Sequence, residues 1–137
     1  MIYLDTNILL YATLSKVDNR VQQEKAISIL KEIIASHSLL LSNLTILEYS
    51  FIMQKANEDT QKINNAIKLF SKYVKNEKDS FNKELINFLN NKNAFKNSFD
   101  LYHIVFANSY NCKKLITFDK GFKKFENICS LKIEIIK

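Results

Sequence analysis

The chain has 137 residues, enough for one domain with an ordinary hydrophobic core, and its 47% hydrophobic content excludes a disordered binding segment. No apolar run approaches the roughly 18 residues of a membrane helix, and Asp5 interrupts the apolar start of the chain, which argues against a secretory signal. We therefore expect a cytoplasmic protein without membrane contact. The net charge of +6 suits a polyanionic partner, although only as a weak indication.

The hydrophobic pattern predicts strands and helices along the whole chain. Short apolar runs typical of strands lie at residues 2–4, 37–41, 115–118 and 131–135. Helical periodicity predicts helices near residues 8–12, 19–36, 44–57, 60–75, 79–89 and 98–107. Residues 73–76 are a candidate for one further, very short edge strand.

This alternation predicts an α/β protein, with a central parallel sheet of four to five short strands between two layers of helices. No linker rich in proline, glycine or serine divides the sequence, and no internal repeat is present. We expect residues 1–137 to form a single three-layer α/β/α domain.

Two acidic residues follow predicted strands. Asp5 comes directly after the strand at residues 2–4, where open α/β sheets bind their ligands, although Asp5 would also serve as an ordinary helix N-cap. Asp119 follows the strand at residues 115–118 in the same way. Its alternative role is in an ordinary turn in which Gly121 adopts a positive φ.

Two further acids lie near the starts of predicted helices. Glu48 falls within an apolar stripe that we expect to be buried, where an acid is costly unless it is paired, for example with Lys55, or binds a metal. The stripe consists of Leu44, Leu47, Phe51 and Ile52. Asp100 lies in the first turn of its helix, where the helix dipole alone could stabilise it.

In a parallel sheet flanked by helices, Asp5, Glu48, Asp100 and Asp119 all reach the edge where the strands end. Two carboxylates ~4 Å apart repel by about 4 kcal/mol at an effective dielectric constant of ~20. The sequence has no set of arginines or histidines placed to neutralise them. A hard divalent cation would remove the repulsion, so the sequence predicts a site for Mg²⁺ or Mn²⁺.

Four motifs occur in order along the chain: Asp5-Thr6-Asn7, Thr45-Ile46-Leu47-Glu48, Asp100 with Ala107 on one helix, and Thr117-Phe118-Asp119. Together they resemble the motifs of PIN-domain ribonucleases, and among these the VapC-type toxins of toxin–antitoxin pairs. The resemblance covers essentially the whole chain. Two features depart from it: residues 73–76 match the family's third strand poorly, and Lys120 and Phe122 follow Asp119 where some relatives have another acid.

The resemblance implies a PIN-like fold and a Mg²⁺-dependent endoribonuclease that hydrolyses RNA phosphodiester bonds. Asp5, Glu48, Asp100 and Asp119 would hold one or two metal ions, and Glu48 or Asp119 would help to deprotonate the attacking water. Thr117, with Thr6 or Asn7, would form hydrogen bonds beside the metal or the phosphate. The resemblance also implies a cognate antitoxin protein that blocks the site, and a homodimer.

Lysines flank Asp119 in the sequence, and we expect them to contact RNA phosphates, although a solvated lysine surface is the alternative. These lysines are Lys113, Lys114, Lys120, Lys123 and Lys124. His103, three residues after Asp100, is a candidate for substrate contact or a packed histidine.

Two other functions remain open. A phosphoacceptor receiver module also places acids and Mg²⁺ at strand ends, but it would have paired acids after its first strand, where Asp5 stands alone, and it would give Glu48 no role. A PIN-like domain that only binds RNA would not need the complete set of acids.

Overall fold

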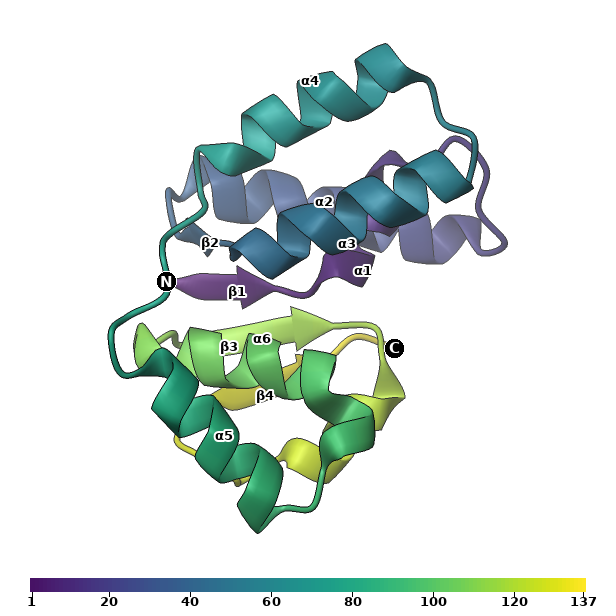
Figure 1. The fold of residues 1–137 in the computed structure, drawn as a ribbon. Coiled ribbons are helices and arrows are strands. Elements are labelled where there is room, and N and C mark those ends of the chain that lie inside the picture. The colour runs from purple at the N-terminus through teal and green to yellow at the C-terminus, as the bar shows by residue number, and fades with distance from the viewer.

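The computed structural model describes all residues from Met1 to Lys137. Its centre is a sheet of four parallel strands in the order β2-β1-β3-β4 (Figure 1). The strands are β1 (Ile2–Leu4), β2 (Leu39–Leu40), β3 (Lys114–Thr117) and β4 (Lys132–Ile135). The strand positions and the parallel sheet predicted from the hydrophobic runs are confirmed, and β4 is an edge strand.

Helices cover both faces of this sheet, which confirms the three-layer α/β/α architecture (Figure 1). The α-helices are α1 (Thr6–Thr13), α2 (Arg20–Ala35), α3 (Asn43–Lys55), α4 (Thr60–Ser71), α5 (Phe81–Asn91) and α6 (Ser98–Ser109). Two 3₁₀ helices, η1 (Phe95–Asn97) and η2 (Lys120–Phe125), complete the fold. None of the helices combines the length and the apolar run needed to cross a membrane.

The strand register divides the core in two. Tyr3 is aligned with Leu40 and Leu115, and Leu115 with Ile133, so these side chains share one face of the sheet. They pack with α5 and α6 in one hydrophobic cluster. The neighbouring strand residues, such as Leu4, point to the opposite face and pack with α1, α2, α3 and α4.

The buried face of α3 differs from the sequence prediction. Thr45, Tyr49 and Met53 are fully buried, and the Tyr49 ring packs edge-on against Phe70 of α4 at a centroid distance of 5.3 Å. Most of the stripe expected to be buried is exposed instead, with Leu47 66% and Phe51 67% accessible, while Leu44 is half-buried. Both sets of residues have helical spacing, and the choice between them depends on where α1 and α4 pack. Glu48 is consequently half-buried at the margin of the core.

Two smaller differences concern the segment after α3. Residues 73–76 form no strand, and only a single parallel bridge joins Leu41 to Val74. Helix α4 ends at Ser71, four residues earlier than the periodicity indicates.

Candidate active site

Asp5 links the start of α1 to strand β3. As the N-cap of α1 it accepts a hydrogen bond on Oδ1 from the backbone N–H of Thr6 at 2.8 Å. Its Oδ2 accepts a hydrogen bond from the Thr117 hydroxyl at 2.7 Å. Asp5 is 7% exposed, and this burial raises its pKa against the opposing effects of His103 and the two hydrogen bonds. Asp5 therefore caps α1 and is also hydrogen-bonded to Thr117 of β3.

Thr117 connects the two acids at the strand ends. Besides donating to Asp5, its hydroxyl accepts hydrogen bonds from the Asp119 backbone N–H at 2.9 Å and from Asn7 Nδ2 at 3.1 Å. Asn7 Oδ1 in turn accepts a hydrogen bond from the backbone N–H of Phe118 at 3.3 Å. Thr117 and Asn7 therefore fix the backbone from which Asp119 projects.

Gly121 lies close to the Asp119 carboxylate, and its backbone does not have the positive φ of the turn considered above, so the prediction of that turn is wrong. Its backbone N–H donates to Asp119 Oδ1 at 2.8 Å, and a Cβ at this position would lie 3.0 Å from the same oxygen. The absence of a side chain lets the backbone approach the carboxylate closely.

Glu48 has a histidine partner that the sequence did not indicate. Its Oε1 accepts hydrogen bonds from the Thr6 hydroxyl at 2.6 Å and from His103 Nε2 at 2.8 Å. Partial burial acts to raise the pKa of Glu48, but the interactions with His103 and Thr6 outweigh it and leave this pKa lowered. One histidine therefore contacts one of the four acids, a pairing that the sequence did not reveal. Lys55 forms no ion pair with Glu48, and its ammonium lies over the Phe51 ring.

His103 is a packed histidine, 2% exposed, and Tyr3 holds its other ring nitrogen. The Tyr3 hydroxyl lies 2.5 Å from Nδ1, 2.8 Å from Ser42 Oγ and 3.0 Å from Thr45 Oγ1. These supporting residues were missed from the sequence. The available signal was Tyr3 itself, because a tyrosine in a buried strand must find a partner for its hydroxyl.

Asp100 shows that the acids lie close enough to interact. Partial burial raises its pKa, and so do the charges of Asp5 and Asp119, against smaller opposing effects of His103 and Lys124. Its carboxylate takes part in no hydrogen bond or ion pair, so only the more distant charges of His103 and Lys124 oppose the repulsion. These charge effects link Asp100 to Asp5 and Asp119, and the convergence of all four acids on one site stays a prediction.

The four acids do not form a ready-made metal centre, since no three acidic, histidine or cysteine groups lie close enough together to hold an ion. Their chemistry nevertheless fits Mg²⁺ or Mn²⁺, because these cations prefer oxygen ligands. Asp100 has both carboxylate oxygens available, and Glu48 forms its hydrogen bonds through Oε1 alone. That Asp5, Glu48, Asp100 and Asp119 hold a metal remains a prediction.

The lysines near Asp119 fall into two groups. Lys120, Lys123 and Lys124 are exposed on η2, which starts directly after Asp119. Lys113 and Lys114 lie at the opposite end of β3, and the Lys114 ammonium pairs with Glu134 at 2.9 Å. Of the five lysines expected to contact RNA, these two therefore lie away from Asp119, because a strand separates them from it.

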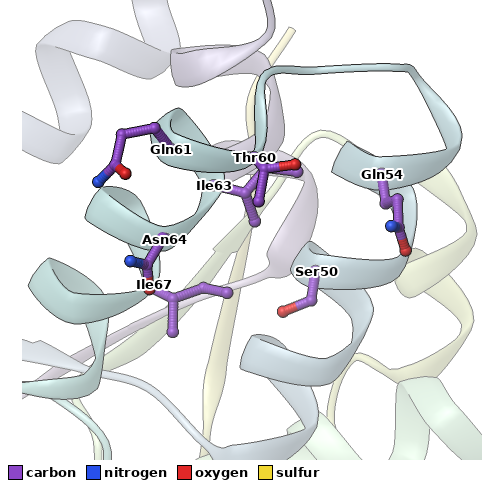
Figure 2. Close-up of a pocket in the computed structure, with 7 residues that line it drawn as sticks. All are labelled: Ser50, Gln54, Thr60, Gln61, Ile63, Asn64 and Ile67. Atoms are coloured by element: carbon purple, nitrogen blue, oxygen red, sulfur yellow. The ribbon is translucent and has the colours of Figure 1, made fainter.

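Two grooves border α3. One, with a cavity of about 330 Å³, runs between α3 and α4 and is lined by uncharged side chains, with Ser50 and Gln54 opposite Ile63 and Ile67 (Figure 2). The other, of about 710 Å³, covers the exposed apolar side of α3. It is lined by Leu44, Leu47, Glu48, Phe51, Ile52, Lys55 and Phe99. Only this second groove reaches one of the acids.

Comparison with known proteins identifies the family. Residues 2–128 match the PIN domain, and the chain therefore belongs to the PIN domain family, as the sequence motifs predicted. This membership disfavours the receiver-module alternative. No curated protein matches the sequence.

Several solved structures have a similar fold. VapBC2 from Rickettsia felis, crystallised with a DNA fragment from its promoter, is 22% identical with a TM-score of 0.70 over 100% of both chains. FitAcB from Neisseria gonorrhoeae is 16% identical with a TM-score of 0.67, over 98% of this chain and 96% of that one. VapC20 from Mycobacterium tuberculosis, described as a toxin that cleaves the sarcin–ricin loop, is 14% identical with a TM-score of 0.68, over 92% of this chain and 95% of that one.

The repulsion at Asp100 leads to a stability test. A raised pKa in the folded state means that the metal-free protein loses stability as the pH rises from about the ordinary value of 3.8 through the folded pKa. Asp100→Asn should therefore raise the free energy of unfolding at pH 7 without metal, by up to about 1 kcal/mol for this partly exposed group.

Added Mn²⁺ should raise the melting temperature of the unmodified protein by mass action, and this rise should shrink in Asp100→Asn. Thermal unfolding with and without Mn²⁺ measures both effects. Asp79→Asn, a change at an exposed acid outside the site, serves as control and should keep the full rise. If Mn²⁺ raises the melting temperature equally in Asp100→Asn and in the unmodified protein, Asp100 does not bind the metal.

Proposed function

We propose that this PIN-domain protein is a metal-dependent endoribonuclease, the toxin of a type II toxin–antitoxin pair. The observation that carries the proposal is the group of acids at the strand ends, where the Thr117 hydroxyl joins the Asp5 carboxylate to the backbone of Asp119, and Thr6 next to Asp5 donates to Glu48. Membership in the PIN family supports the nuclease activity. The description of VapC20 as a toxin that cleaves the sarcin–ricin loop supports RNA as the substrate.

In this proposal, Asp5, Glu48, Asp100 and Asp119 hold one or two Mg²⁺ or Mn²⁺ ions. A bound divalent cation supplies a water of lowered pKa and neutralises charge on the phosphate oxygens. Thr117 and Thr6 keep Asp5 and Glu48 in place through hydrogen bonds of 2.7 Å and 2.6 Å. Glu48 or Asp119 accepts the proton of the attacking water.

The distribution of histidines favours attack by water over attack by the 2′-hydroxyl of the RNA. The latter route commonly uses a pair of histidines as general base and acid. Here His37 is exposed in the turn before β2, and His103 is buried with its ring nitrogens directed at Tyr3 and Glu48. The two therefore do not form such a pair.

The proposal includes a cognate antitoxin and a homodimer. The crystal structures of VapBC2 and FitAcB support a protein partner of this kind. The exposed apolar side chains of Leu47, Phe51 and Phe99 add support from this chain, because they line a groove that extends to Glu48. A protein seated there would limit access to the acids.

The proposed activity can be measured with purified protein, Mg²⁺ and a mixture of structured RNAs. Glu48→Gln and Asp100→Asn should each lower the cleavage rate by about 100-fold or more, because each removes a charged oxygen ligand. Asp79→Asn should cut at the unmodified rate. RNA binding without any cleavage would instead support the non-catalytic PIN-like alternative.

The lysines of η2 should dominate RNA binding. Replacing Lys120, Lys123 and Lys124 by Gln should weaken binding to all RNA sequences and reduce the slope of log K against log salt by roughly 0.7 per lost phosphate contact. The matched control replaces Lys113 and Lys114, which lie at the far end of β3, and should leave the slope unchanged. If the salt dependence of binding changes only when Lys113 and Lys114 are replaced, the RNA binds at the opposite edge of the sheet.

A further inference from the structure

His103 lies between a tyrosine and a proposed metal ligand, in a position that defines its hydrogen bonds. The ring is 2% exposed, with Nε2 2.8 Å from Glu48 Oε1 and Nδ1 2.5 Å from the Tyr3 hydroxyl. An ionised carboxylate can only accept a hydrogen bond, so Nε2 carries a proton and donates it to Glu48.

The surroundings hold the ring in this orientation. Tyr3 belongs to β1 and is fully buried, and its hydroxyl is fixed in turn by Ser42 and Thr45 at the start of α3. The rings of Tyr3 and Tyr102 pack against His103 at centroid distances of 5.6 Å and 6.0 Å. No buried side-chain nitrogen or oxygen in the chain is left without a hydrogen-bond partner.

Glu48 itself has less support from its own helix. It lies in the middle of α3 at the margin of the core, next to the exposed Leu47, and 29% of its side chain is accessible. Without a donor from inside the fold, its flexible side chain could turn toward solvent. The hydrogen bonds from His103 and Thr6 both go to Oε1, which holds the carboxylate at the site and leaves Oε2 for a ligand.

We propose that His103, oriented by Tyr3, is a positioning residue that fixes the Glu48 carboxylate for metal binding. The inference rests on the proposed function, because Glu48 must be a ligand for its orientation to matter. Groups that orient metal ligands in this way typically change metal affinity or activity by 10–100-fold when removed. His103 acts through Glu48 and touches no reacting atom.

Three variants separate positioning from packing. His103→Leu fills the space but removes both ring nitrogens. His103→Gln places an amide donor near the position of Nε2 and should restore the hydrogen bond to Glu48. Tyr3→Phe removes only the hydroxyl that holds the ring. His37→Asn is the control, since His37 is the one other histidine, is exposed and has a φ of 55°, which asparagine readily adopts.

The readouts are the Kd for Mn²⁺ from calorimetry on the full chain, the RNA cleavage rate with saturating Mn²⁺, and the melting temperature without metal. His103→Leu should weaken Mn²⁺ binding by about 10–100-fold, and Tyr3→Phe by a smaller factor. His103→Gln should recover most of the loss, while His37→Asn should match the unmodified protein. The rescue by Gln is a result that a purely structural role would not give.

The inference and the proposed function fail in different ways. An unmodified protein that binds Mn²⁺ and cuts RNA, together with unchanged Mn²⁺ affinity in a folded His103→Leu variant, would overturn the positioning role alone. Equal losses in the Leu and Gln variants would also overturn it, because the effect would then come from packing. An unmodified protein that neither binds Mn²⁺ nor cuts RNA would overturn the proposed function and this inference with it.

Discussion

Repulsion between carboxylates at the ends of parallel strands is the constraint on which the rest of this site depends. Asp5 follows β1 and Asp119 comes shortly after β3, and these strands are neighbours in the sheet. Their charges raise the pKa of Asp100 at the start of α6. Bringing these carboxylates together lowers the stability of the folded protein, because ionised carboxylates in partly buried surroundings disfavour the compact state.

The chain compensates part of this repulsion with hydroxyl and imidazole donors. Thr117 donates to Asp5, while Thr6 and His103 donate to Glu48. These donors come from β3, α1 and α6, so the orientation of each carboxylate depends on the packing of a different element. Asp100 is the exception, since it has no donor, and a cation would compensate it most directly. The proposed metal dependence follows from this unequal distribution of donors.

The sequence was sufficient for the features that follow from strand direction. Parallel strands end at one edge, so the positions of Asp5 and Asp119 could be predicted from two short apolar runs. The same rule should have separated Lys113 and Lys114 from the site, because they lie at the start of the strand that Asp119 follows. The sequence could not identify the buried face of α3, where two residue sets share the helical period and tertiary packing buries Thr45, Tyr49 and Met53.

His103 shows a different limit of the sequence. Its spacing from Asp100 places it one turn further along α6, but the spacing does not show which other element it meets. Its partners, Tyr3 and Glu48, are 100 and 55 residues away in the chain. Only the packing of α6 against β1 and α3 brings the three together.

The most direct test of the metal-dependent hydrolysis is the chemistry of the RNA ends after cleavage by the purified protein with Mg²⁺. When water attacks the phosphorus and the 3′-oxygen leaves, the products carry a 5′-phosphate and a 3′-hydroxyl. We expect these ends, detected by direct ligation through the 5′-phosphate, and we expect excess EDTA to stop cleavage. Products with 2′,3′-cyclic phosphate and 5′-hydroxyl ends, or cleavage that persists in EDTA, would contradict the mechanism even though the fold is that of a PIN domain.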